Sequence, residues 1–355
     1  MRELQVRRDD YRETRSVERD DRPLEDGEIR LDIERFALTS NNVTYAVAGD
    51  RIGYWQFFPV DADWGIVPVW GIGRIVDSRA DGLEVGETIY GYFPMSDTTI
   101  MKAGRIKAGS FTEVSEHRKP LPPLYNNYRR LAVEPEGFED ERCLYFPLFM
   151  TSYAIYDWLV DNDMFGAEQV VIGSVSSKTG LGVAKLLADD PELDVDVIGL
   201  TSPGNVAFVE SLDACDRILT YGREGEIPAR PTAYVDMSGN VELGRTLHQH
   251  LGEHMVLSSR VGATHWEGAQ MGDHGELPGA KPQMFFAPSQ ILKREADWGP
   301  GMFVAKAAEA SLRLARELEG TIAVERVEGT DALAEVWRDF LDNKVSPSRG
   351  VMVSL

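Results

Sequence analysis

The chain has 355 residues, which is long enough for two domains that each bury a core. Its formal net charge of −21 argues against nucleic acid as a partner, because such proteins concentrate lysine and arginine. We expect no membrane span, since no apolar run reaches about 18 residues, and no signal peptide, since residues 1–20 are a charged mixture. Cys143 and Cys215, outside any C-x-x-C motif, fit a reducing compartment, so we expect a cytoplasmic protein without a cysteine-built zinc site.

The N-terminal third predicts a β-rich domain. Residues 1–24 are polar, and we expect them to be peripheral. Gly27–Ala37 alternates apolar and polar residues, as a half-buried strand does. Val67–Val76, Thr88–Phe93 and Phe111–Val114 have the composition of further strands, separated by glycine-containing turns. Together they predict a partly closed barrel.

Six aromatic residues lie close together within this third: Tyr54, Trp55, Phe57, Phe58, Trp64 and Trp70. One interpretation is a pocket for a flat, apolar substrate. The other is the packed core of the barrel, continued by an interface where tyrosine and tryptophan are favoured. The residues by themselves leave both interpretations open.

Strands alternate with helices in the second half of the chain. Residues 146–160 are apolar around most of a helical circumference and predict a buried helix. Five strands follow: Val170–Ile172, Val195–Leu200, Asp216–Tyr221, Thr232–Met237 and Met255–Ser259. This alternation predicts a doubly wound parallel sheet. Residues 263–301 have a loop-like composition; after them we expect a helix at Met302–Leu318, a strand at Thr321–Val327, a helix at Asp331–Asp342 and a strand at Gly350–Leu355.

The segment Gln169–Leu187 predicts an anion site. A strand, a turn of small residues and a helix N-terminus would present backbone N–H groups and a positive dipole end to a pyrophosphate. The glycine positions of the dinucleotide fingerprint G-x-G-x-x-G are Val175, Ser177 and Gly180 here. A Walker A loop is not favoured, because Ile172 and Ser177 occupy its glycine positions. The candidate pyrophosphate contacts are Ser176, Ser177, Lys178, Thr179 and Gly180.

The end of the second predicted strand bears on the choice of cofactor. Its residues Leu200, Thr201 and Ser202 include no aspartate or glutamate, the residue that binds the ribose diol of NAD. This absence favours a 2′-phosphate and therefore NADP(H). We expect Thr201, Ser202 and Asn205 to lie near that phosphate.

Several short motifs occur in an order that resembles a known superfamily. They are Asn41–Tyr45 (NNVTY), Gly82–Glu87 (GLEVGE), the apolar helix within residues 148–159, Leu212–Asp216 (LDACD) and Tyr221–Glu224 (YGRE). In this order they resemble the zinc-free medium-chain dehydrogenase/reductase superfamily, on its quinone oxidoreductase and enoyl reductase side. The combination is also similar to an uncharacterised branch known as a domain of unknown function.

The resemblance implies an α/β fold of two domains. A GroES-like β-barrel would comprise residues 1–149 and 291–355, and a Rossmann domain residues 150–290, with the active site in the cleft. It further implies NADP(H) without a metal, a small apolar or aromatic carbonyl substrate, and a homodimer, a state common among similar proteins.

The resemblance also implies roles for individual residues. Tyr45 would donate a hydrogen bond or proton to the substrate oxygen, oriented by Asn41 or Asn42, and Thr151 would approach the nicotinamide. The further cofactor contacts would be Tyr221, Val261 and Gly262. The alternatives are that Tyr45 packs in the barrel and that Thr151 caps its own helical turn. The function implied is hydride transfer from NADPH to an activated C=C or quinone-like carbonyl, and the alternative is a binding or scaffold protein without turnover.

A histidine cluster in the sequence HQHLGEH offers possible metal ligands. His250 and His254 would share a helix face. The segment precedes the fifth predicted strand, where the fold places a peripheral helix. We therefore favour a solvated helix over a metal site.

Overall fold

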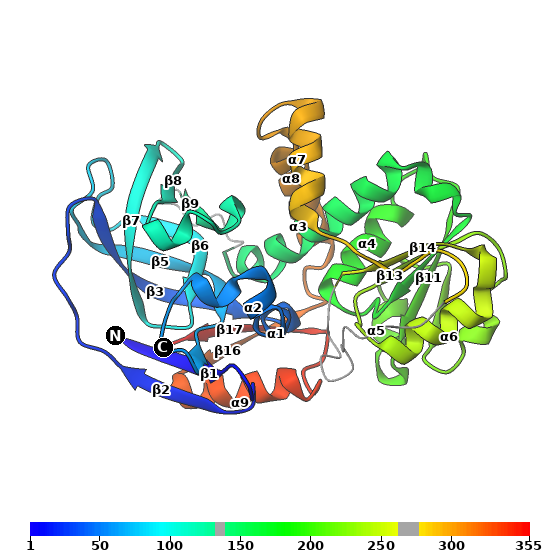
Figure 1. The fold of residues 1–355 in the computed structure, drawn as a ribbon, viewed down its shortest axis with the longest axis horizontal. Helices are drawn as coiled ribbons and strands as arrows, with labels where there is room; N and C mark the ends of the chain where they lie inside the picture. Colours follow the sequence, from blue (N-terminus) through cyan, green and yellow to red (C-terminus); the bar gives the residue numbers. More distant parts are fainter. Residues whose placement is uncertain (132–138, 262–276) are drawn as a thin grey trace. The chain divides into compact units, whose positions relative to one another are not determined.

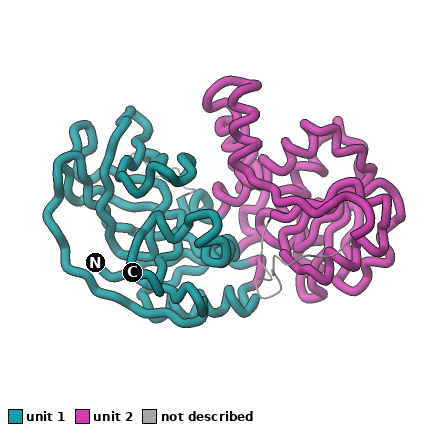
Figure 2. Tube along the Cα trace, viewed as in Figure 1, with its two compact units in different colours: residues 1–144, 323–345, 349–355 teal, residues 145–322, 346–348 magenta. Residues whose placement is uncertain are grey.

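The computed structural model describes residues 1–131, 139–261 and 277–355. It forms two compact units, one of Met1–Leu144, Ala323–Val345 and Arg349–Leu355, the other of Tyr145–Ile322 and Ser346–Ser348 (Figure 2). From the sequence we expect the second segment of the barrel domain to begin at residue 291. In the structure, residues 291–322 belong to the second unit instead.

Helix packing within the second unit accounts for this assignment. α7 (Ala287–Trp298) and α8 (Met302–Glu317) contact the part of α3 (Glu139–Asp161) that belongs to the same unit. Arg294 donates to Asp157 of α3 at 2.8 Å, and Phe303 of α8 stacks edge-on against Tyr153. The prediction of a loop over residues 263–301 is wrong for α7, because the glycine and proline residues around this helix give the segment a loop-like composition. Residues 262–276 lie outside the described part.

The first unit contains a closed β-barrel (Figure 1). Its strands are β3 (Glu28–Leu38), β5 (Pro68–Ser78), β6 (Thr88–Pro94), β9 (Asn127–Arg130), β8 (Ser110–Glu113) and β7 (Thr98–Lys107), in spatial order. β7 pairs back onto β3, which closes the ring of strands. β17 (Arg349–Ser354) pairs with β3, and β16 (Ala323–Glu328) pairs with β17, so the end of the chain extends this sheet. The predicted barrel is confirmed.

Short helices complete the first unit. α1 (Ser40–Val47) and α2 (Gly49–Ile52) follow β3, and α9 (Thr330–Leu341) connects β16 to β17. Within the described residues, no helix combines the length and apolar character that crossing a bilayer requires.

The prediction that residues 1–24 are peripheral is wrong for residues 3–6, which are buried, whereas residues 7–23 are exposed or half-buried. β1 (Arg2–Arg7) pairs with β2 (Thr14–Glu18) on one side and β4 (Trp64–Gly65) on the other. Leu4 and Val6 are fully buried, and so is Glu3, which forms an ion pair with Arg19 at 2.9 Å. The prediction failed because the burial of a charged residue depends on a partner that local periodicity does not reveal.

The second unit is built on a parallel sheet, as predicted, with six strands where the sequence predicts five, since β15 lies within the segment expected to be a loop. Its strands are β10 (Gln169–Gly173), β11 (Asp196–Thr201), β12 (Arg217–Thr220), β13 (Thr232–Asp236), β14 (Met255–Arg260) and β15 (Gln283–Met284). The spatial order β12-β11-β10-β13-β14-β15 is the 3-2-1-4-5-6 order of dinucleotide-binding Rossmann sheets. Ligands of such sheets bind at the carboxyl ends of the strands, beside the point where the order reverses, here between β10 and β13.

Helices α4 (Lys178–Ala188), α5 (Val206–Glu210) and α6 (Val241–Leu251) connect the strands. One face of the sheet packs against α6 and forms a buried hydrophobic core. The residues of this core are Val171, Ile198, Leu200, Leu219, Ile227, Tyr234, Leu243, Leu247, Leu251 and Met255. This packing fixes the carboxyl edge of the sheet, where Gly173 of β10 lies beside Leu200 on one side and Asp236 on the other.

Candidate functional site

The turn between β10 and α4 leads the chain from the carboxyl edge of the sheet into a helix. Ser174 takes a left-handed conformation, with φ of 58°, and its carbonyl accepts a hydrogen bond from Ser177 N at 2.9 Å. Ser177 is the N-cap of α4, and its Oγ accepts from Gly180 N at 3.2 Å. An N-cap hydroxyl of this kind stabilises a helix start by about 1 kcal/mol. The strand, turn and helix predicted for Gln169–Leu187 are therefore confirmed.

Gly180, the last position of the glycine fingerprint, allows the helix to lie close against the turn. A Cβ at this position would be 2.7 Å from Ser174 O and 3.0 Å from Val175 Cα. Real Cβ atoms do not tolerate such contacts, so only glycine fits without a shift of backbone. This is the role of the third glycine in dinucleotide-binding turns, which allows close packing of helix and strand.

The side chains at the other two fingerprint positions are turned away from the mouth of the turn. Val175 is 1% exposed and packs against β11, where a Cβ on Gly199 would lie 2.7 Å from Val175 Cγ1. Ser177 is turned into the helix cap. Gly199 on the neighbouring strand, which has no side chain, thus provides the space that the Val175 side chain fills. Gly199 was missed in the sequence, although a glycine inside a strand is itself a signal of close approach.

Three predicted cofactor residues meet at the ends of β10 and β11. Ser176 Oγ lies within hydrogen-bonding distance of Thr201 Oγ1, at 3.0 Å, and of Asn205 Nδ2, at 3.3 Å. Ser176 and Thr201 are buried, and Asn205 is half-buried. Ser202 precedes the 3₁₀ turn Pro203–Asn205, and its carbonyl accepts from Asn205 N at 2.9 Å. The cluster formed by Ser176, Thr201 and Asn205 has polar groups but no carboxylate.

Lys178 begins α4 and is half-buried. Its Nζ donates a hydrogen bond to Pro347 O at 3.3 Å. Desolvation lowers the pKa of the Lys178 ammonium group to about 8. The next residue, Thr179, accepts a hydrogen bond through its carbonyl from Ser152 Oγ of α3 at 2.9 Å, which joins the first turn of α4 to α3.

The remaining predicted cofactor residues occupy different surroundings. Tyr221 follows β12 and packs against the core under α6, where burial raises the pKa of its hydroxyl to about 12. Val261 follows β14, and its N–H donates to Asp236 O at 2.9 Å. Gly262 lies outside the described residues.

Three of the predicted catalytic residues, Asn41, Asn42 and Tyr45, lie on α1 of the first unit. Tyr45 is 4% exposed, and its hydroxyl accepts a hydrogen bond from Trp70 Nε1 at 3.2 Å. Burial raises the pKa of Tyr45 well above its usual value, with a further contribution from Tyr54, while hydrogen bonds from Trp70 and Asn41 oppose the shift. The hydroxyl is therefore protonated at neutral pH and able to act as a hydrogen-bond donor.

Asn42 and Thr151 are engaged in their own local structure. Asn42 Oδ1 accepts from Thr39 N at 2.7 Å, and its Nδ2 donates to Pro68 O at 2.8 Å, so its amide holds the start of α1 against β5. Thr151 Oγ1 donates to Pro147 O at 3.1 Å, which is the bond of a threonine to its own helical turn.

The aromatic run is mainly core. Trp55 is 2% exposed and fills space left by two glycines, since a Cβ on Gly49 would lie 2.1 Å from its Nε1 and one on Gly65 2.2 Å from its Cε3. Tyr45 and Tyr54 have ring centroids 4.6 Å apart, and the rings of Phe57, Trp70, Tyr92 and Tyr125 pack around them. This packing favours the core interpretation over an open pocket for most of the run.

Comparison with known proteins assigns the chain to a family. The model of the family described as "Protein of unknown function (DUF2855)" matches residues 36–346. The chain belongs to this family. No curated protein matches it significantly in sequence.

Solved structures similar to this DUF2855 chain show its fold. CurA from Vibrio vulnificus, solved with NADPH, has a TM-score of 0.65 at 14% identity and covers 100% of this chain and 99% of its own. The yhdH oxidoreductase of Salmonella enterica, solved with NADP, has a TM-score of 0.54 at 15% identity over 100% of both chains. CurK enoyl reductase has a TM-score of 0.55 at 12% identity over 99% and 98%. The predicted fold of a GroES-like barrel with a Rossmann unit is confirmed.

Asp236, at the end of β13, was not singled out in the sequence. The residue is 3% exposed, and its Oδ1 accepts from Ser238 N at 2.8 Å, Ser238 Oγ at 2.5 Å and Gly239 N at 3.2 Å. Burial raises the pKa of the Asp236 carboxyl group. A Cβ on Gly173 would lie 2.9 Å from this carboxylate, so Asp236 shapes the loop beside the β10–α4 turn of the DUF2855 chain.

The histidines of α6 differ from the prediction of a solvated helix. His248 is 1% exposed, with Nδ1 2.9 Å from Pro278 O and Nε2 2.9 Å from Ser258 Oγ. His250 Nε2 lies 2.8 Å from Ile227 O. The prediction is wrong for His248, because α6 turns this face toward β14. The described residues include no group of three or more His, Cys, Asp or Glu side chains placed to hold a metal ion.

The contact between Val175 and Gly199 makes a testable prediction. Gly199→Ala should lower the free energy of unfolding by about 1–3 kcal/mol, because the added methyl overlaps Val175 Cγ1 and also lies 3.0 Å from Cys215 Sγ. Gly204→Ala is the matched control, since a Cβ there meets nothing within 4 Å, and its effect should stay within about 0.5 kcal/mol. Denaturant titration measures both, and equal effects of the two substitutions would contradict the compensation.

Proposed function

We propose that this DUF2855 protein is an NADPH-dependent oxidoreductase. The observation that carries the proposal is the cluster of Ser176, Thr201 and Asn205 at the carboxyl edge of a Rossmann sheet, with no acidic residue where NAD enzymes place one. Hydroxyl and amide groups suit the oxygens of a 2′-phosphate, whereas a carboxylate would repel them. The complexes of CurA with NADPH and of the yhdH oxidoreductase with NADP support the same cofactor.

The residues of the second unit fit this cofactor. In the proposal, the turn Ser176–Gly180 and the start of α4 hold the pyrophosphate, because a helix N-terminus attracts anions. The side chains of Val175 and Ser177 would not obstruct the pyrophosphate. Val175 is buried, and Ser177 caps the helix. Ser202 would assist at the 2′-phosphate, and Val261 and Gly262 would lie near the nicotinamide.

The cofactor supplies the hydride, and the chain orients the reactants. We place Tyr45 in the role of hydrogen-bond donor to the oxygen that gains negative charge. Its high pKa keeps the proton on the hydroxyl, while Trp70 Nε1 holds the oxygen in place. Asn41 would orient the same hydroxyl; Asn42 and Thr151 would act indirectly, through the helices that they stabilise.

For the substrate we propose an activated C=C or a quinone-like carbonyl compound of apolar or aromatic character. The similarity of fold to CurK enoyl reductase and the tyrosine-rich surroundings of Tyr45 support this class. A second candidate is a nucleotide-binding protein without turnover. The observation that favours it is the 4% exposure of Tyr45 among packed rings.

Cofactor preference provides the first test. Asn205→Asp should weaken NADPH binding at least about tenfold while leaving NADH binding nearly unchanged, because the new carboxylate would repel a 2′-phosphate. Asn162→Asp introduces the same charge at an exposed position of the same unit and should have no such effect. Fluorescence titration measures both affinities, and the proposal fails if the wild-type protein binds neither nucleotide.

The pH dependence of cofactor binding provides the second test. Lys178 is protonated below its pKa of about 8, so NADPH affinity should be constant at lower pH and fall as the pH rises through 8. Lys178→Arg should remove this fall, because guanidinium remains charged throughout the range. The dissociation constant measured between pH 6 and about pH 9.5 decides the matter, and an unchanged profile in the variant would rule out a role for Lys178 in binding.

Turnover provides the third test. Tyr45→Phe should lower kcat by about 10²-fold, within the range of a positioned proton donor, without weakening NADPH binding. Tyr54→Phe is the matched control, because its ring lies 4.6 Å from that of Tyr45 while its hydroxyl bonds to Tyr125 instead. Loss of NADPH absorbance with a panel of quinones and enones measures the rate. NADPH binding without any turnover would favour the second candidate.

A further inference from the structure

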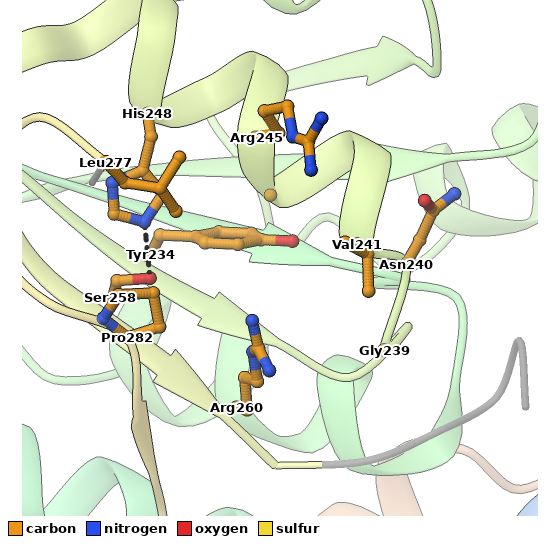
Figure 3. Close-up of a pocket in the computed structure, with 11 residues that line it drawn as sticks. Tyr234, Gly239, Asn240, Val241, Arg245, His248, Ser258, Arg260, Leu277 and Pro282 are labelled. Carbon is orange, nitrogen blue, oxygen red and sulfur yellow. Dashed lines mark hydrogen bonds between the residues drawn. The ribbon is translucent and has the colours of Figure 1, made fainter. Parts of the chain in front are cut away.

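A pocket on the second unit lies between α6 and the strands β13 and β14 (Figure 3). It is separate from the cluster of Ser176, Thr201 and Asn205, none of which lines it. α6 contributes Arg245 and His248, and β14 contributes Ser258 and Arg260. The proposed oxidoreductase mechanism uses none of these side chains.

The charge of the pocket is opposite to that of the chain as a whole. Two arginines line it, and none of its described lining residues is acidic, although the chain has 58 acidic and 37 basic residues. Arg260 is half-buried, and no carboxylate in the described ranges forms an ion pair with it. Within the described residues Arg245 forms an ion pair with Glu242 alone, at 3.9 Å, where both side chains are exposed and the attraction is weak.

Tyr234 adds a buried hydroxyl group to the residues that line the pocket. It is 2% exposed, lines the pocket, and its hydroxyl makes no well-aligned hydrogen bond to any described residue. Figure 3 shows its ring between the side chains of Arg245 and Arg260. The carboxyl group of Asp236 lies beside this hydroxyl and interacts with it, while Asp236 Oδ1 accepts hydrogen bonds from Ser238 and Gly239.

Two further polar side chains of the pocket, Asn240 and His248, are held in place by hydrogen bonds. Asn240 Oδ1 accepts from Glu242 N and Leu243 N, each at 3.1 Å, so its amide nitrogen remains a donor. His248 is fixed between Pro278 O and Ser258 Oγ and forms one wall. A cation would be repelled by the two guanidinium groups, and an apolar ligand would offer them no hydrogen-bond acceptor.

We propose that this pocket binds a phosphate group, either as inorganic phosphate or as the phosphate of a small phosphorylated compound. The guanidinium groups of Arg245 and Arg260 balance its two negative charges, and Tyr234 and Asn240 donate hydrogen bonds to its oxygens. Arginine suits this ligand because its planar fork of N–H groups matches two phosphate oxygens at once.

Calorimetric titration of the full-length protein with inorganic phosphate and with glycerol phosphate tests the proposal. Arg260→Gln and Arg245→Gln should each weaken binding at least about tenfold. Arg245 is exposed, so its variant tests the pocket even if the half-buried Arg260 is needed for folding, which thermal unfolding reports. Tighter binding of glycerol phosphate would identify a phosphorylated compound as the ligand, and equal or weaker binding would identify free phosphate.

Two controls separate this pocket from other anion sites. Arg223→Gln removes an exposed arginine of the same unit that pairs with Glu226, and Ser176→Ala alters the proposed cofactor site. Arg223→Gln should bind phosphate within about twofold of the wild-type protein, whereas Ser176→Ala reports any phosphate that binds at the proposed cofactor site instead. The proposal is overturned if the wild-type protein shows no saturable binding, or if Ser176→Ala abolishes binding that Arg260→Gln and Arg245→Gln retain.

Discussion

The close contact between the start of α4 and the end of β10 is the constraint on which the second unit depends. Gly180 allows that contact, because a side chain there would meet the carbonyl of Ser174 at 2.7 Å. The approach brings the first turn of the helix to the carboxyl edge of the sheet, between strands whose order reverses at this point. A helix N-terminus in this place attracts anions, so one packing contact determines where a phosphate group can bind.

The turn also shows how a dinucleotide-binding geometry can be kept with two of its glycines replaced. Val175 is accommodated by Gly199 on the next strand, and Ser177 replaces glycine with a side chain that caps the helix. Both side chains therefore pack against the protein and leave the open face of the turn free. The G-x-G-x-x-G motif is therefore one way to keep side chains out of the space where a pyrophosphate binds. Other residues, such as those in this turn, can keep that space open as well.

The polar groups of the two units have different surroundings. In the first unit Tyr45 and its aromatic neighbours form a tightly packed core, in which the hydroxyl of Tyr54 bonds to that of Tyr125 and the hydroxyl of Tyr45 accepts from Trp70. In the second unit the hydroxyl and amide groups of Ser176, Thr201 and Asn205 lie together at the carboxyl ends of β10 and β11. Preformed donors near the sheet edge favour the binding of anionic ligands, and the overall negative charge does not prevent this because local groups dominate at short range.

The sequence by itself determined the order of most strands and helices, the parallel sheet, the barrel and the position of the β10–α4 turn. These features depend on local hydrophobic period and on turn residues, which any short window of sequence contains. It also determined that no acid follows Thr201. Only the tertiary structure decided that Glu3 and His248 are buried, that β7 closes the barrel on β3, and that Gly199 makes room for Val175. It alone brought Asn205 to Ser176 and left Tyr234 facing two arginines. The physical reason is that each of these facts is a contact between residues far apart in the chain, and a local period carries no record of its distant partner.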